Sequence, residues 1–146
     1  MIKTYLALGS NVDDPQKQLE WAVAQLNALP QSQVIQVSSF IHTKPVGFAQ
    51  QPDILNAVLE LDTQLPPHTL LALVLDLEIQ RKRKRIIKNG PRTLDIDILL
   101  YGDLVLNDPD LMIPHPRMWE RDFVLIPLYA IAPFLRTSCL NNLRSS

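Results

Sequence analysis

The order of apolar patterns along this 146-residue chain limits the folds that are open to it. Runs typical of strands and runs at helical spacing follow one another in the order β-α-β-β-α-β. This order predicts an α+β, ferredoxin-like fold, in which an antiparallel sheet carries helices packed on one face. The segments that form the pattern are residues 2–8, 15–29, 34–41, 54–62, 69–80 and 95–101.

Local signals support these segments. Asp14 is a favoured helix N-cap and Pro15 suits the first helical position. That helix is expected to end at Pro30, and its apolar stripe consists of Leu19, Ala22, Val23 and Leu26. Side chains alternate between faces in the strand of residues 54–62, and one face collects Leu55, Ala57, Leu59 and Leu61. We also expect a turn at residues 9–11, a hairpin at 101–107 and a short helix at 124–132.

The composition is that of one globular domain, residues 1–146, with a frayed tail at residues 137–146. The formal net charge is −1, whereas a nucleic-acid-binding domain is expected to be basic. The single cysteine, Cys139, cannot form an internal disulfide and suits a reducing compartment. The sequence shows neither a signal peptide nor an apolar run of about 18 residues. We therefore expect a cytoplasmic monomer with no nucleic-acid or membrane partner.

A cationic run precedes the last predicted strand. Seven of the fourteen Lys and Arg residues lie within residues 81–92, and this run contains the turn signal Gly90-Pro91. Such runs are most often solvated loops or interaction tails. This one leads directly into Asp95-Ile96-Asp97, so we expect a mobile cationic loop beside two carboxylates. That combination suits a phosphate-bearing ligand.

The two carboxylates indicate a metal site. If residues 95–101 are extended, Asp95 and Asp97 point the same way, roughly 6 to 7 Å apart, while Ile96 and Ile98 enter the core. Two neighbouring like charges repel unless cations or protons lie between them. Mg²⁺ commonly takes one or two carboxylates together with substrate phosphates. An isolated Asp-x-Asp on a solvated strand face is the alternative.

Several other polar residues are candidates, each with a structural alternative. Asn56 is unusual in a strand and its amide could read a heterocyclic edge, unless it is a surface residue near a turn. His115, between two prolines, could donate to phosphate or serve a structural role. Arg121 and Phe123 alternate as on an extended stretch, so Arg121 could bind phosphate and Phe123 could stack on a flat ring or join the core. Glu78 could pair with Arg83 or Arg85.

Together these motifs resemble the 6-hydroxymethyl-7,8-dihydropterin pyrophosphokinase family over about residues 2–135. The block Gly90-Pro91-Arg92-Thr93-Leu94-Asp95-Ile96-Asp97 is the family's specific signature. The flanking blocks follow in the family's order: Leu8-Gly9-Ser10-Asn11, Ser38-Ser39-Phe40, Gln51-Pro52-Asp53-Ile54-Leu55-Asn56, Pro114-His115-Pro116-Arg117-Met118, Arg121 and Ile126-Pro127-Leu128.

The resemblance implies a ferredoxin-like enzyme of folate biosynthesis that transfers pyrophosphate from ATP to the pterin's hydroxymethyl group and releases AMP. It implies two Mg²⁺ ions held by Asp95 and Asp97, with ATP and the reduced pterin as partners. Arg83, Arg92, Asp95 and Asp97 would be the catalytic residues.

The resemblance also assigns two binding sets. The ATP set is Glu78, Arg83, Arg85, Arg92, Ile98, His115 and Arg121. The pterin set is Thr43, Val46, Ile54, Asn56, Asp95 and Phe123.

Four residues depart from the family pattern. Ile54 stands where an aromatic ring often forms a second wall for the pterin. Asn89 stands where many members have Trp, and Lys82 replaces a glycine. Asp110 stands where some members have a basic residue near the nucleotide.

Two other function classes compete with this interpretation. A different Mg²⁺-dependent phosphotransferase or nucleotidyltransferase could use the same carboxylate pair. A ferredoxin-like sheet can also bind RNA, but that function expects aromatic residues on the central strands. Asp95 and Asp97 lie there instead, and carboxylates repel phosphate when no metal is bound.

Overall fold

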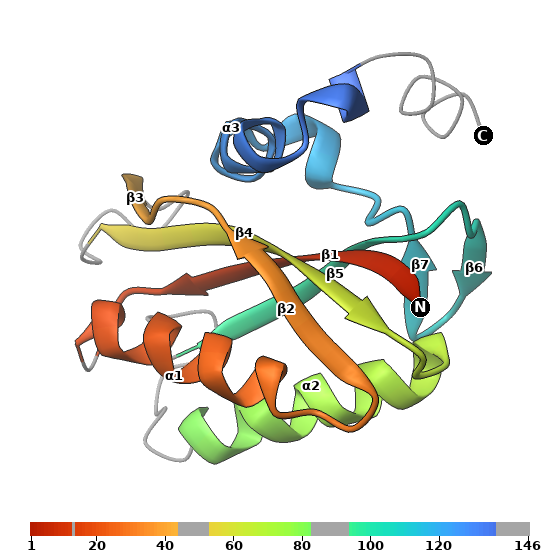
Figure 1. Ribbon diagram of the computed structural model, residues 1–146. Coiled ribbons are helices and arrows are strands. Elements are labelled where there is room, and N and C mark those ends of the chain that lie inside the picture. Colours follow the sequence, from red (N-terminus) through yellow and green to blue (C-terminus); the bar gives the residue numbers. More distant parts are fainter. Residues whose placement is uncertain (13, 44–52, 83–93, 137–146) are drawn as a thin grey trace.

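A computed structural model of the chain describes residues 1–12, 14–43, 53–82 (the side chain of residue 82 excepted) and 94–136. The described residues contain three α-helices, which lie around the main sheet (Figure 1). Within the described residues, no helix is long and apolar enough to cross a membrane. The strands and α-helices are β1 (Ile2–Ser10), α1 (Pro15–Asn27), β2 (Ser32–Val37), β3 (Ile41–Thr43), β4 (Ile54–Thr63), α2 (Pro67–Lys82), β5 (Asp95–Tyr101), β6 (Leu106–Asp108), β7 (Leu111–Ile113) and α3 (Asp122–Ile131). Two short 3-10 helices, η1 (Met118–Glu120) and η2 (Pro133–Arg136), precede and follow α3.

The main sheet confirms the ferredoxin-like prediction. Its strands follow the order β2-β4-β1-β5, every recorded pairing is antiparallel, and β3 adds to β4. β1 is therefore central, between β4 and β5. β1 also continues through Gly9 and Ser10, where the sequence predicted a turn. This extension places Gly9 opposite both neighbouring strands.

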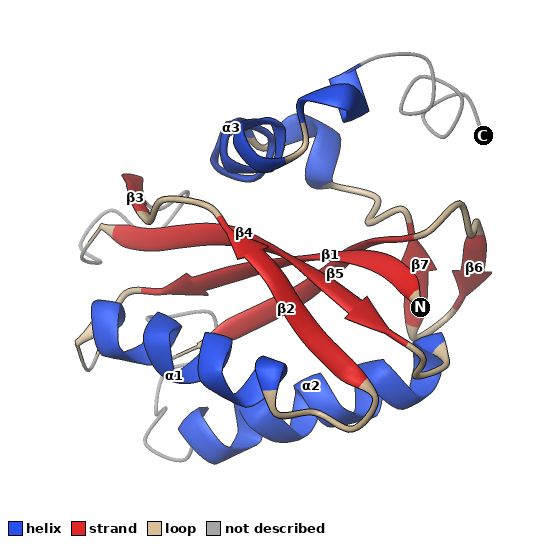
Figure 2. Cartoon of the chain, in the orientation of Figure 1, coloured by secondary structure: helices blue, strands red, loops and turns tan. Residues whose placement is uncertain are grey.

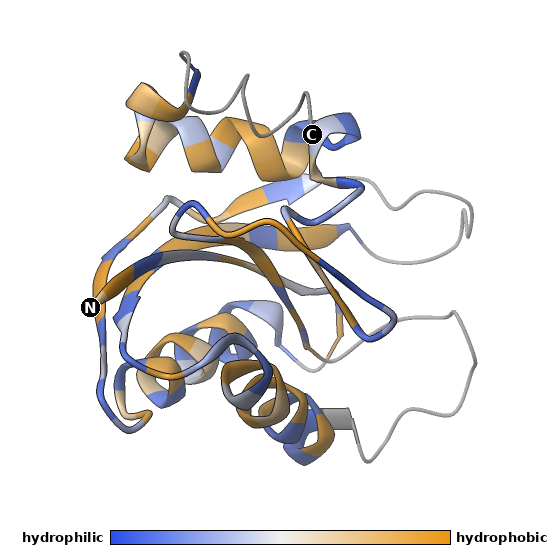
Figure 3. Ribbon diagram, turned by 90° about the vertical axis from the view of Figure 1, so that its right-hand side faces the viewer, coloured by the Kyte–Doolittle hydropathy of each residue, from blue (hydrophilic) through white to orange (hydrophobic). Residues whose placement is uncertain are grey.

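Helices cover both faces of the sheet, so the prediction of helices on one face is wrong for α3. α1 and α2 enclose a core on one side, which includes Leu6, Leu19, Leu59 and Leu70. On the other side α3 packs against the sheet through a second core, with Tyr5, Val58, Val124 and Leu128. Figures 2 and 3 show these layers from two directions. The predicted apolar face of β4, with Leu55, Ala57, Leu59 and Leu61, is confirmed in the first core.

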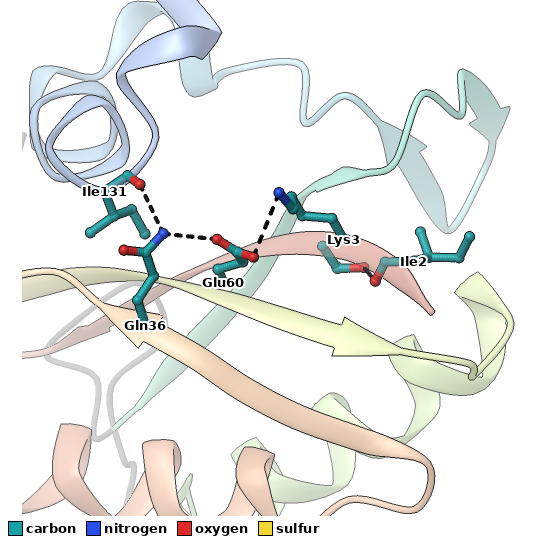
Figure 4. A network of polar contacts seen from close by, with 6 residues as sticks. Ile2, Lys3, Gln36, Glu60 and Ile131 are labelled. Carbon is teal, nitrogen blue, oxygen red and sulfur yellow. Dashed lines mark hydrogen bonds and ion pairs between the residues drawn. The ribbon is translucent and has the colours of Figure 1, made fainter.

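A polar network fixes the C-terminal end of α3 to the sheet (Figure 4). The side-chain amide of Gln36 donates to Glu60 Oε1 at 2.8 Å and to the carbonyl of Ile131 at 2.9 Å. Ile131 ends α3, so its carbonyl has no partner within the helix. Lys3 Nζ lies 3.9 Å from Glu60 Oε2, which gives the buried carboxylate a nearby positive charge.

Two predicted elements differ from the structure. The strand predicted at residues 34–41 is divided into β2 and β3, because Ser38 binds β4 through its side chain between them. Its N–H donates to the carbonyl of Val58 at 2.8 Å, and its hydroxyl accepts from the N–H of Val58 at 2.9 Å. The hairpin predicted at residues 101–107 is wrong, since β6 pairs with β7 in a separate two-stranded sheet. Gly102, with φ of +53°, ends β5 and directs the chain away from it.

Replacing Ser38 by Ala should lower the free energy of unfolding by about 1–3 kcal/mol, because the buried N–H of Val58 loses its acceptor. Urea denaturation measures the change. Ser39→Ala is the matched control, because Ser39 is exposed and takes part in the recorded bonds only through its carbonyl. Equal midpoints for the two variants would contradict the assigned role of the Ser38 hydroxyl.

Candidate functional site

Apart from Glu78, the polar candidates within the described residues converge on the α3 side of the sheet, where β1 ends and β4 and β5 begin. Gly9 on β1 is paired with Asn56 on β4 and with Asp95 on β5. Ala7, two residues earlier, is paired with Val58 and Asp97 in the same way. Asn56 and Asp95 therefore flank Gly9 in one row, about 10 Å apart across two strand spacings.

The two carboxylates lie as the strand pattern predicts. Asp95 and Asp97 are half-buried, while Ile96 and Ile98 are 4% exposed and belong to the core beneath α1 and α2. Asp95 and Asp97 thus share the α3 side, with donor chemistry suited to a hard divalent cation. The side chain of Ile98 points away from them, so Ile98 can face this site only through its main chain.

Small residues of β1 lie between Asn56 and the carboxylates in the sheet, namely Gly9 and Ala7. A methyl group added to Gly9 would lie 3.4 Å from Asn56 Oδ1 and 3.7 Å from Ile54 Cγ2. Both distances are ordinary van der Waals contacts, so a methyl group would fit here without a clash and would fill space beside these two side chains that Gly9 leaves free. Sequence reasoning did not assign this role to Gly9 or Ala7. The available signal was the position of small residues between the leucines of β1.

Asn56 is 5% exposed, so the alternative of a surface asparagine is wrong. Its amide nitrogen donates to Thr43 Oγ1 at 2.7 Å and to the carbonyl of Ile54 at 3.3 Å. These two bonds hold the amide plane in place and leave its oxygen toward Gly9. The structure thus brings together Thr43, Ile54 and Asn56 from the predicted pterin set.

His115 is attached to β5 and lies near the Asp97 carboxylate. Its N–H donates to the carbonyl of Leu99 at 2.9 Å, and its Nδ1 accepts from the N–H of Arg117 at 3.2 Å. Burial lowers the pKa of His115; the Asp97 carboxylate opposes that shift, and the Arg121 and Arg117 charges add to it. With Nδ1 accepting, the neutral ring carries its proton on Nε2 and can donate there.

Arg121 and Phe123 lie at the start of α3. Arg121 is the extended N-cap residue, and its guanidinium lies 5.7 Å from the centre of the Phe123 ring. The prediction that both residues lie on an extended stretch is wrong for Phe123, which is in the first turn of α3. Phe123 is half-buried against the second core, so its ring has a packed side and an exposed remainder.

Glu78, on α2, binds the main chain of β5 from the opposite face of the sheet. It is 7% exposed, and its Oε2 accepts a hydrogen bond of 2.7 Å from the N–H of Ile96, between the two aspartates. The carboxylate thereby fixes the beginning of β5. Its predicted partners Arg83 and Arg85 lie outside the described residues, as do Arg92, Val46, Asn89 and Cys139.

Glu78→Ala should lower the free energy of unfolding by about 1–3 kcal/mol, because it leaves the buried N–H of Ile96 without its acceptor. Glu78→Gln is the matched control, since its side-chain carbonyl can still accept. Urea denaturation compares the two variants. A loss in Glu78→Gln as large as that in Glu78→Ala would contradict the importance of this bond.

Acid should destabilise the protein partly through His115. The folded-state pKa is below the ordinary 6.5, so below about pH 6.5 the unfolded chain binds a proton that the folded chain does not. The contribution of His115 to stability is therefore present above pH 6.5 and is lost as the pH falls toward the folded-state pKa. In urea denaturation at pH 7.5 and 5.5, His115→Gln should lose less stability than the parent. An equal loss would show that burial does not disfavour the charged ring.

Comparison with known proteins places the chain in one family. Residues 5–133 match the family model described as 7,8-dihydro-6-hydroxymethylpterin-pyrophosphokinase. The chain is 42% identical over 132 residues to the 2-amino-4-hydroxy-6-hydroxymethyldihydropteridine pyrophosphokinase of Haemophilus influenzae, covering 90% of this chain and 82% of that protein. It is 44% identical over 127 residues to the protein of the same name from Bacillus subtilis, covering 87% and 76%.

A longer relative contains the same unit. The bifunctional protein FolKE of Lactococcus lactis subsp. lactis is 40% identical over 131 residues, covering 90% of this chain and 38% of that protein. The family match spans most of the chain, and the two single-unit relatives are covered over most of their length. The chain therefore belongs to the 7,8-dihydro-6-hydroxymethylpterin-pyrophosphokinase family.

Proposed function

We propose that this chain transfers the pyrophosphoryl group of ATP to the hydroxymethyl oxygen of 6-hydroxymethyl-7,8-dihydropterin, a step of folate biosynthesis that leaves AMP. The observation that carries the proposal is the row Asn56–Gly9–Asp95 across three adjacent strands. A group that recognises a heterocycle and a group that holds a cation lie on one face, with only a glycine between them. A substrate with a flat ring and a short reactive arm fits that separation.

The pterin would bind at the β4 side of the row. Asn56, held by Thr43, presents a fixed amide to the ring edge. A fixed polar group gives specificity, because a ring whose donors and acceptors do not match leaves the amide unpaired. Phe123 supplies an aromatic face from α3 and Ile54 an aliphatic one from β4. By resemblance, Val46 would complete the pocket.

The ATP phosphates would bind at the β5 side. Asp95 and Asp97 would hold Mg²⁺, two ions by resemblance, because both carboxylates are partly accessible on the same face. Bound there, Mg²⁺ neutralises phosphate charge and favours ionisation of the attacking hydroxyl. The neutral His115 can donate from Nε2 to a phosphate oxygen, and Arg121 adds a fixed positive charge.

The protein side chains would act mainly by positioning the two substrates and by neutralising the charge of the phosphates, as in other phosphoryl transfers. The pterin hydroxyl would attack the β-phosphorus, and the bond to the α-phosphate oxygen would break with AMP as the leaving group. Arg83, Arg85 and Arg92 would stabilise the developing charge by resemblance. Glu78 would position β5 through Ile96, and Ile98 would offer only main-chain atoms to the nucleotide.

The products test this proposal. Purified protein is incubated with Mg²⁺-ATP, with and without the reduced hydroxymethylpterin, and the nucleotides are separated. Pterin-dependent AMP without ADP is expected. ADP would indicate single phosphoryl transfer, the competing interpretation, and a folded protein without turnover would contradict the proposed substrate pair.

Asp97→Asn should reduce turnover by about a thousandfold or more, because a carboxylate ligand contributes several kcal/mol of charge stabilisation. Asp103→Asn, in the exposed turn beyond β5, is the matched control. Steady-state AMP production at saturating Mg²⁺ measures both variants. Normal turnover in Asp97→Asn would remove Asp97 from the metal site.

Ile54→Tyr should tighten pterin binding by about two- to tenfold, the range that corresponds to 0.5–1.5 kcal/mol of aromatic stacking. Ile54→Leu is the control for a change of shape without an aromatic ring. Calorimetric titration with the pterin gives the dissociation constants. Identical constants for the two variants would show that residue 54 does not face the ring.

A further inference from the structure

We propose that His68, Asp108 and Asp110 form a second metal site, which binds a divalent transition metal such as Co²⁺ or Zn²⁺. His68 lies in the first turn of α2, Asp108 ends β6 and Asp110 lies in the turn before β7. The three side chains thus come from α2 and from the β6–β7 hairpin, which are distant in sequence. The proposed catalysis gives no role to these three residues, and Asp110 is one of the departures from the family pattern named above.

The distances between the donor atoms suit one small ion. His68 Nε2 lies 3.1 Å from Asp108 Oδ2 and 3.5 Å from Asp110 Oδ1, and all three ligand atoms lie within 4.8 Å of one another. Ligand atoms bound tetrahedrally at 2.0–2.2 Å are about 3.3–3.6 Å apart. The separation between His68 and Asp110 lies within that range, and the separation between His68 and Asp108 is slightly shorter. The side chain of Asp110 is 67% exposed and can rotate to close the third side.

Charge and ligand chemistry both favour a cation here. Two carboxylates face one imidazole, and within the described part of the chain His68 is the only ion-pair partner recorded for either aspartate. A neutral imidazole leaves two negative charges uncompensated, which a divalent ion would neutralise. Imidazole with carboxylate suits Zn²⁺, Co²⁺ or Ni²⁺, whereas Mg²⁺ prefers oxygen ligands. The half-exposed positions of the three side chains would leave room for water as the remaining ligands.

The cluster is separate from the carboxylates of the candidate active site. Tyr101, at the end of β5 opposite to Asp95, donates to the carbonyl of Leu65 just before α2. Glu78, which binds Ile96 beside Asp95, is ten residues further along α2 than His68, about 15 Å of helix. A metal at His68 would therefore join the start of α2 to the β6–β7 hairpin, away from Asp95 and Asp97. The proposal does not depend on the proposed function.

Co²⁺ titration of the untagged, chelator-treated full chain tests the site, followed by calorimetry and by visible absorption of the ion. An excess of Mg²⁺ is present throughout, to occupy the oxygen ligands Asp95 and Asp97. We expect one Co²⁺ per chain with an imidazole-ligated spectrum, and a thermal midpoint raised by several degrees because the ion binds the folded chain. Zn²⁺ should displace the Co²⁺.

Three variants locate the binding. His68→Ala and Asp110→Asn should each weaken Co²⁺ binding at least tenfold, while His42→Ala, an exposed histidine on β3, should leave it unchanged. Undiminished binding in His68→Ala would overturn the proposal, and so would a folded parent chain that binds no Co²⁺. In the latter case the cluster is only a polar contact between His68 and the two aspartates. His68→Ala is also assayed for AMP production with Mg²⁺. Normal AMP production shows that the variant is folded, so its loss of Co²⁺ binding then reports on the second metal site and not on the proposed function.

Discussion

The register of β1 between β4 and β5 is the constraint on which the rest of the structure depends. Hydrogen bonding on both sides fixes Gly9 opposite Asn56 and Asp95, and Ala7 opposite Val58 and Asp97. A shift of one residue in either pairing would turn the polar side chains toward α1 and α2 and the leucines toward α3. The fold therefore cannot form its first core without also placing the amide and the carboxylates on the opposite face.

Two buried glutamates, Glu78 and Glu60, help to fix β5 and α3, the elements that border this face. Glu78 binds the main chain of β5 from the α2 side, and Glu60 receives Gln36, which in turn binds the end of α3. Each carboxylate is buried and accepts a hydrogen bond, which is the condition under which a buried polar group is tolerated. The cost of leaving either one unpaired ties the positions of β5 and α3 to the sheet. The site thus lies between elements that buried hydrogen bonds attach to the sheet, and such attachment favours the positioning of reacting groups.

Local patterns in the sequence predicted much of this arrangement. The alternation of Asp95, Ile96 and Asp97 was enough to predict their faces, because the period of a strand is fixed by its backbone. The apolar face of β4 was predicted for the same reason. The N-cap Asp14 was predicted because its side chain can accept a hydrogen bond from the first turn of the helix, and the structure confirms both. Asn56 was singled out because an amide is costly inside a strand, and its bond to Thr43 now explains how it is tolerated.

The errors concern interactions between distant residues. The division of β2 from β3 depends on the Ser38 hydroxyl and Val58, and α3 occupies the second face because Val124 and Leu128 meet Val58 there. No pattern within residues 122–131 specifies which face of a sheet will receive the helix. The roles of Gly9 and Glu78 likewise became visible only with the strand register and with the partner Ile96.

The central claim is that the carboxylates and the Asn56 amide face one shared space across Gly9. Paramagnetic relaxation tests this most directly, with Mn²⁺ in place of Mg²⁺ together with a non-hydrolysable ATP analogue and the reduced pterin. The hydroxymethyl protons of the bound pterin should be strongly broadened, and Asp97→Asn should abolish the effect while pterin binding persists. Sharp hydroxymethyl resonances in a complex with both ligands bound would contradict a shared site.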